Sequence, residues 1–159
     1  MSLIVHHVPA LTDEARTLIL ELEAELSGLY TAEQRHGLTP NEVFRAGVLF
    51  FVAHLDGVAD GCGGIAIEGD FGELKRMYVR PQARHRGVAR AILDTLDEVA
   101  RDRGVRRLAL ETGDMLHAAI RFYERAGFTR CAPFGAYARM SSAVIERSVF
   151  LDKRIGTCG

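Results

Sequence analysis

The segment from Glu73 to Gly104 limits the fold of this chain more than any other. Glu73–Val79 carries the apolar pattern of a strand, and the following Arg80-Pro81 blocks further sheet pairing. Residues 88–103 then place apolar side chains on one broad stripe, and Gly104 supplies the usual helix stop. A strand, a basic turn containing glycine and a long helix predict part of an α/β crossover unit.

The other segments predict strands and helices around this unit. We expect strands at 48–55, 58–67, 107–111, 128–131 and 148–152, and helices at 12–26, near 39–44 and at 116–126. The turn signal Asp56-Gly57 predicts that the first two strands form a hairpin. Because strand and helix alternate after Glu73, we expect a right-handed crossover between parallel strands in a mixed sheet with helices on its faces.

Composition and charge exclude several classes of protein. The balance of apolar and charged residues is that of a soluble globular chain, and 159 residues suffice for one domain. A net charge of -1 gives no support for a nucleic-acid or membrane partner. The start lacks a signal-peptide pattern and no apolar run has membrane-spanning length, so we expect a cytoplasmic protein. Cys62, Cys131 and Cys158 have neither disulfide-framework nor metal-ligand spacing, and Cys62 is expected to be a small buried thiol.

The charges are unevenly distributed along the chain. Residues 1–40 contain six acids against two arginines, whereas residues 75–107 contain ten Lys or Arg against four acids. The basic excess is explained either by a solvated helix face or by an anionic ligand such as a phosphorylated cofactor. The charge count alone leaves both explanations open.

The turn from Arg84 to Ala89, with the sequence RHRGVA, lies where a phosphate is most easily held. Gly87 allows an anion to approach the backbone, and the first N–H groups and the dipole of the following helix favour negative charge. The turn lacks the Gly-Lys-Ser/Thr of a Walker motif and the full G-x-G-x-x-G of a dinucleotide fold. The pattern therefore indicates a pyrophosphate cradle of a different kind.

These segments resemble the GNAT superfamily of acetyltransferases, whose central motif is a strand, a Q/R-x-x-G-x-G/A turn and a long helix. Leu74–Val79, Arg84–Ala89 and 88–103 match it, and Ala119–Phe128 is similar to the family's A-x-x-x-Y-x-x-x-G-F helix. The resemblance covers residues 48–131. It implies an α/β (α+β) fold: a mixed, mostly antiparallel sheet of six to seven strands with helices on both faces and a splayed parallel pair at its centre.

The resemblance also implies how the chain is divided and where the cofactor binds. Residues 1–159 would form a single domain, with acceptor-side helices in 1–47, an acetyl-coenzyme A-binding core in 48–131, and a C-terminal loop and strand in 132–159. The strand backbone would contact the pantetheine arm, and the basic turn would hold the pyrophosphate. The expected cofactor contacts are Met77, Tyr78, Val79, Arg84, His85, Arg86, Gly87, Val88, Ala89, Arg90, Thr112, Phe122 and Tyr123.

Two positions near the expected cofactor qualify this resemblance. Many family members have Asn seven residues before the tyrosine, where this chain has Leu116. Thr112 is expected either to cap the following helix or to bond the cofactor arm, and helix capping is the favoured interpretation.

The resemblance implies two catalytic residues. Tyr123 stands where many members place the general acid for the departing thiolate, although it also belongs to an apolar stripe that packs a helix. Glu73 stands at the spacing of a glutamate base, although it is equally explained as a surface carboxylate paired with Lys75 or Arg76. The candidates for the acceptor site, which solvation or packing would also explain, are Tyr30, Arg35, His36, Phe134 and Tyr137.

The resulting hypothesis is an acetyl-coenzyme A-dependent N-acetyltransferase. It would acetylate a primary amine of an amino acid, a polyamine or another amine-bearing metabolite or drug, by direct attack in a ternary complex without a metal. The alternatives are a noncatalytic acyl-coenzyme A sensor and an enzyme that acetylates a protein or peptide amine. A homodimer is a further option, because homodimers are common in the family.

Overall fold

The computed structural model describes residues 1–156, so Cys158 lies outside the described residues. The strands in that range are β1 (Leu3–Val8), β2 (Leu49–Leu55), β3 (Val58–Glu68), β4 (Phe71–Val79), β5 (Arg107–Gly113), β6 (Thr129–Arg130) and β7 (Ser148–Arg154). These seven described strands form one sheet in the order β1-β2-β3-β4-β5-β7-β6. Only the β4–β5 pair is parallel. The predicted mixed, mostly antiparallel sheet is therefore confirmed.

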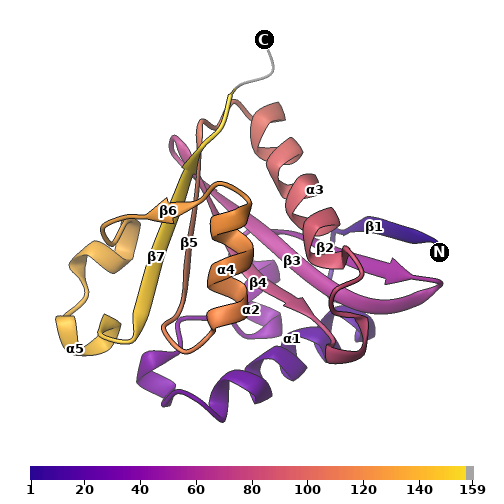
Figure 1. Cartoon of the computed structure of the whole chain (residues 1–159), viewed down its shortest axis with the longest axis horizontal. Helices are drawn as coiled ribbons and strands as arrows, with labels where there is room; N and C mark the ends of the chain where they lie inside the picture. The colour runs from indigo at the N-terminus through magenta and orange to yellow at the C-terminus, as the bar shows by residue number, and fades with distance from the viewer. Residues whose placement is uncertain (157–159) are drawn as a thin grey trace.

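Helices cover both faces of this sheet, as predicted (Figure 1). The α-helices within residues 1–156 are α1 (Asp13–Ser27), α2 (Pro40–Arg45), α3 (Val88–Asp102), α4 (His117–Arg125) and α5 (Ser142–Ile145). Short 3-10 helices are η1 (Ala32–Gln34), η2 (Pro81–Ala83) and η3 (Gly135–Arg139). One core lies between the sheet and α3 and α4, and a second lies beneath α1 and α2. Within the described part of the chain, none of these helices has the length and apolarity to cross a membrane.

Local sequence signals explain where several elements begin and end. The Thr12 side chain accepts a hydrogen bond from the Ala15 N–H at 3.1 Å and caps α1. Thr39 and Glu42 form a reciprocal capping box that begins α2. Asp56 and Gly57 have φ values of 50° and 82°, which is the requirement of a two-residue type I′ hairpin. The predicted helix starts and the predicted hairpin are thus confirmed.

The parallel pair opens along its length. Its register contains three pairs, from Phe71 opposite Arg107 to Glu73 opposite Ala109, and the strands then separate. Figure 1 shows β4 and β5 close together at one end and diverging toward the other. β7 lies antiparallel to β5 on the other side. The splayed parallel pair expected from the family resemblance is confirmed.

A β-bulge changes the direction of the side chains on β4 at this opening. Arg76 has a φ of 53°, and the register between β3 and β4 shifts between Cys62 and Gly64. As a result, Arg76 points toward α1, while Met77 packs against the core on the α3 face. The bulge therefore gathers charged side chains on the α1 face and keeps the following apolar residue on the other.

Part of the basic excess in residues 75–107 is neutralised by α1. Arg80 pairs with Glu21 at 2.8 Å, and Arg84 pairs with Glu25 at 3.0 Å. Arg76 pairs with Glu23 at 2.8 Å. The acidic N-terminal region and the basic central region are therefore partners across the fold, which neither sequence-based explanation included.

Two features of the fold differ from the predictions. β1 was not predicted, because its two adjacent histidines, His6 and His7, obscure a half-buried alternating pattern. The capping interpretation of Thr112 is wrong: this residue lies within β5, paired with Val149, and the N-cap of α4 is Leu116, without a side-chain cap. Thr112 is a strand residue because β5 continues two residues beyond the predicted end.

Candidate active site

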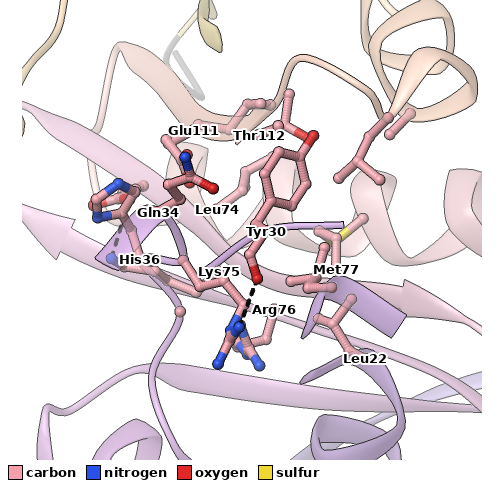
Figure 2. Close-up of a pocket in the computed structure, with 18 of the residues that line it drawn as sticks. Leu22, Tyr30, Gln34, His36, Leu74, Lys75, Arg76, Met77, Glu111 and Thr112 are labelled. Carbon is pink, nitrogen blue, oxygen red and sulfur yellow. Dashed lines mark hydrogen bonds and ion pairs between the residues drawn. The ribbon is translucent and has the colours of Figure 1, made fainter. Parts of the chain in front are cut away.

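A cavity of about 140 Å³ lies where β4 and β5 separate. In Figure 2, His36, Lys75 and Glu111 lie on one side of the Tyr30 ring, and Leu22 and Met77 lie on the other. The cavity thus has a charged side and an apolar side. Its lining also includes Leu26, Gln34, Arg35, Gly37, Glu73, Leu74, Arg76, Leu110, Thr112, Gly113, Leu116, Ala119, Tyr123 and Tyr137.

Glu73 is held in a fixed position on the charged side. Its side chain is buried, accepts a hydrogen bond from the Tyr137 hydroxyl at 2.6 Å, and lies 3.0 Å from the Lys75 ammonium. The predicted pairing with Lys75 is therefore present, but the carboxylate is not on the surface. Burial raises the pKa of the Tyr137 phenol, and the negative charge of Glu73 raises it further. Tyr137 consequently stays protonated and serves as a donor to Glu73.

Glu111 is a second carboxylate of the cavity, and sequence reasoning gave it no role. It accepts a hydrogen bond from the Ser148 hydroxyl at 2.7 Å. Burial raises the pKa of Glu111, and the charge of Glu73 adds to this, while Ser148, His36 and Lys75 offset it only in part. Glu111 lies on β5 two residues beyond Ala109, where the pairing with β4 has ended, so its place in the cavity follows from the separation of the strands and no local sequence signal indicates it.

Tyr123 reaches the same cavity from α4. It is buried, its ring packs edge-on against Phe122 and Phe128, and its hydroxyl has no hydrogen-bond partner among residues 1–156. Burial raises the pKa of this phenol above its usual range. Both properties suit a proton donor at the start of a reaction, since the hydroxyl is protonated and uncommitted.

Four of the five predicted acceptor-site residues line the cavity, namely Tyr30, Arg35, His36 and Tyr137. The Tyr30 hydroxyl accepts from the Met115 N–H at 2.8 Å, which fixes the ring against the loop after β5. Phe134, the fifth, does not line the cavity. Its ring packs edge-on against Phe71, Tyr137 and Phe150, in an aromatic cluster that adjoins the cavity through Tyr137.

The predicted cofactor residues fall into three groups. Met77 and Thr112 line the cavity, as Tyr123 does. Val79, at the end of β4, accepts a hydrogen bond through its carbonyl from the Arg84 side chain at 2.9 Å. The remaining residues lie outside the cavity, on the turn, on the first turn of α3, on α4 or under α1; they are His85, Arg86, Gly87, Val88, Ala89, Arg90, Phe122 and Tyr78.

The turn before α3 has the geometry that an anion requires. Gly87 is the N-cap of this 15-residue helix, with a φ of 82°, and a Cβ at this position would meet nothing within 4 Å. The space above the helix terminus is thus open, and the first helical N–H groups have no intrahelical partners. Of the nearby cations, Arg84 pairs with Glu25 at 3.0 Å, Arg90 pairs with Asp94 at 3.0 Å, and the half-exposed Arg86 pairs with Asp56 at 3.9 Å. The backbone N–H groups are therefore the groups that fit a phosphate, and Arg86, held by the longest of these three ion pairs, is the nearest cation to add to them.

Tyr78 differs from its neighbours on β4. Its side chain lies in the core beneath α1, and its hydroxyl donates to Glu21 at 3.2 Å. A cofactor bound between the separated ends of β4 and β5 would therefore contact only the backbone of Tyr78.

The cysteines behave as small packing residues where the structure describes them. Cys62 is fully buried, and its thiol donates to the Arg76 carbonyl at 3.3 Å. Burial raises the pKa of this thiol to about 12, so it stays protonated, which confirms the buried-thiol prediction. Among residues 1–156, no group of three His, Cys, Asp or Glu side chains is arranged to hold a metal ion.

Comparison with known proteins identifies the family. Residues 13–128 match the sequence model of the acetyltransferase (GNAT) family. This chain belongs to the GNAT family. An IAA acetyltransferase from Azospirillum brasilense is 40% identical over 129 residues, which cover 80% of this chain and 84% of that protein.

Solved GNAT structures share the fold described above. A Klebsiella pneumoniae protein assigned as an acyl-CoA N-acyltransferase is similar over 97% of this chain and 98% of its own, with 30% identity and a TM-score of 0.77. The PaiA N-acetyltransferase from Thermoplasma acidophilum, crystallised with coenzyme A, has a TM-score of 0.73 at 16% identity and covers 98% of this chain and 100% of its own. The resemblance inferred from the sequence motifs is therefore confirmed.

Proposed function

We propose that this GNAT protein transfers an acetyl group from acetyl-coenzyme A to a primary amine of a small molecule. One observation carries the proposal: a cavity at the splayed strands is lined by a buried, uncommitted phenol, Tyr123, a buried carboxylate, Glu73, and a half-buried carboxylate, Glu111. A proton donor and proton acceptors around one enclosed space are what thioester aminolysis needs. The size of the cavity suits a small acceptor better than a folded protein surface.

The acceptor amine must first lose a proton. An alkylammonium of pKa about 10.4 costs roughly 4 to 5 kcal/mol to deprotonate at pH 7. Glu73, held by Tyr137 and Lys75, accepts this proton directly or through a water molecule. The free amine then attacks the thioester carbonyl within the ternary complex, and no covalent enzyme intermediate is formed.

The departing sulfur receives its proton from Tyr123. As the new N–C bond forms and the C–S bond breaks, the thiolate takes the phenolic proton, which returns to the tyrosine from solvent. The raised pKa of the buried phenol keeps the donor protonated at every working pH. The proton lost by the amine and the proton gained by the sulfur are thus handled by two different residues of the cavity, Glu73 and Tyr123.

We propose that acetyl-coenzyme A is held by the separated ends of β4 and β5 and by the turn and helix that follow β4. The turn around Gly87 and the first N–H groups of α3 fit the pyrophosphate, and Met77, Thr112 and the edge of β4 fit the pantetheine arm. In this arrangement residues 48–131 bind the donor, residues 1–47 form the acceptor side, and residues from 132 to 156 close it. Coenzyme A bound to the Thermoplasma relative supports this part of the proposal.

The experiment that tests the function is thiol release from acetyl-coenzyme A in the presence of a panel of amines, amino acids and short peptides. The proposal predicts amine-dependent release by the wild-type protein, with a matching acetylated product by mass spectrometry. Acetyl-coenzyme A binding without release for any amine would instead favour a noncatalytic sensor.

A further inference from the structure

Two arginines beside the cavity share one carboxylate. Arg35 Nε lies 2.7 Å from Glu23 Oε1, and Arg76 Nη2 lies 2.8 Å from Glu23 Oε2. Burial alone would raise the pKa of Glu23, but hydrogen bonds from both guanidinium groups outweigh it and keep the pKa below its usual range. Glu23 is therefore ionised and neutralises one of the two positive charges. Among residues 1–156, neither arginine pairs with another acid.

The guanidinium group of Arg76 is fixed in place. The Arg76 side chain is 4% exposed, and its buried Nε has no hydrogen-bond partner. A Cβ on Gly37 would lie 1.5 Å from Arg76 Nη1, so the guanidinium group lies directly against the Gly37 backbone and cannot move that way. Arg35 also donates through Nη1 to the Tyr30 carbonyl at 2.8 Å. A buried charge without compensation is costly, so this pair favours an anion in the cavity.

The two carboxylates of the cavity, Glu73 and Glu111, have too few positive partners. Glu73 is matched by Lys75 at 3.0 Å. Glu111 forms no ion pair among the described residues, and its hydrogen-bond donor is the neutral hydroxyl of Ser148. The cavity therefore contains one unmatched positive charge near Arg35 and Arg76 and one site for unmatched negative charge at Glu111.

We infer that the acceptor is an amine that also carries a carboxylate, as an amino acid does, with the carboxylate at Arg35 and the amine on the Glu73–Glu111 side. This inference rests on the proposed function and narrows its substrate class. A zwitterion supplies both missing partners, whereas a polyamine supplies only positive charge. Arg35 is partly exposed and contacts the substrate carboxylate. The buried Arg76 does not touch the substrate; it is a positioning residue that shares Glu23 with Arg35 and adds its positive charge to the site.

The test compares matched substrates in the thiol-release assay. The twenty protein amino acids are each measured, and the best substrates are compared with the amines that lack only the carboxylate, such as phenylalanine with phenethylamine or leucine with 3-methylbutylamine. The expected preference for the amino acid is on the order of a hundredfold in kcat/KM. An equal or better rate for the decarboxylated amine overturns the inference, and this comparison requires no variant.

The variant Arg35→Gln should collapse that preference, mainly through a higher KM for the amino acid. Arg16→Gln, at an exposed arginine of α1, is the matched control and should retain it. A preference that survives Arg35→Gln would contradict the assignment of this residue.

A binding measurement separates this inference from the proposed function. Calorimetric titration of the same amino acids into the protein with coenzyme A should detect binding that Arg35→Gln weakens, even if no acetyl transfer is observed. Absence of binding by every amino acid would overturn the inference, while amine-dependent thiol release would still support the proposed function.

Discussion

The two ends of the β4–β5 pair differ in what surrounds them. At the closed end, Phe71 and Gly72 pair with β5, Phe134 packs against Phe71, and Arg107 pairs with Asp152 at 2.9 Å; Glu73, the last paired residue of β4, already lines the cavity. At the open end, the strands have no partner on their facing edges, and charged residues surround a cavity. The same two strands therefore provide a stable core at one end and a reactive site at the other.

The packing at the closed end stabilises the strands at the open end, where they do not pair. Paired backbone and stacked aromatic rings fix the strand positions, so that charged residues one or two positions farther on can remain buried and oriented. Removing an aromatic ring at the closed end should then reduce stability, and removing the proton donor at the open end should reduce turnover.

The largest effect is expected at the open end from Tyr123→Phe. Loss of the proton donor should lower kcat by about 10² to 10⁴, the usual contribution of general acid catalysis, with acetyl-coenzyme A affinity nearly intact. Steady-state thiol release and calorimetry measure the two quantities, and thermal melting checks the fold. Unchanged turnover at every pH would remove the acid assignment.

At the closed end, Phe134→Ala should lower the free energy of unfolding by about 3 to 5 kcal/mol, because it leaves a hole among three aromatic rings. Urea unfolding measures this loss, and Phe134→Leu is the milder control. If the alanine variant kept its stability but lost turnover, the division between the two ends would be wrong.

Gly37→Ala probes the contact that fixes Arg76 beside the open end. The new methyl group would meet the guanidinium at 1.5 Å, so we expect a loss of about 1 to 3 kcal/mol in stability. Gly28→Ala is the matched control, since its Cβ would lie 3.6 Å from the nearest atom. Equal stability of the two variants, measured by urea unfolding, would show that Arg76 is free to move.

The smallest effect concerns Glu111 and the pH dependence of stability. Because burial raises its folded pKa, the unfolded state releases the proton first, and wild-type stability falls as pH rises from the unfolded value toward the folded one. Each unit of elevation corresponds to about 1.4 kcal/mol. Glu111→Gln should therefore gain stability relative to wild type at pH 8 compared with pH 4. A constant difference in urea unfolding across that range would contradict the raised pKa.

The secondary structure was largely predictable because its signals are local. The threonine caps, the Asp56-Gly57 hairpin and the apolar stripe of α3 each depend on neighbouring residues, and all are present. β1 escaped prediction because its pattern acquires meaning only when it pairs with β2.

The site was predictable where the family motifs reach it and unpredictable where it depends on pairing across the fold. Tyr123 and Glu73 do line one cavity, although their catalytic roles remain predictions. Glu111 and the sharing of Glu23 by two arginines depend on strand register and on the docking of α1, which no local pattern records. Phe134 lies in the aromatic cluster behind Tyr137, because an aromatic residue on a turn can face a ligand or a core and packing decides which.

Calorimetric titration of acetyl-coenzyme A into the wild-type protein and into Gly87→Glu tests whether the turn before α3 holds the cofactor. Gly104→Glu is the matched control, because Gly104 also has a positive φ and open space for a Cβ, at the opposite end of α3. We expect binding by the wild type and by Gly104→Glu, and loss of binding in Gly87→Glu. Folded wild-type protein that does not bind acetyl-coenzyme A, or Gly87→Glu that binds it as tightly as the wild type, would show that this turn is not a cofactor site.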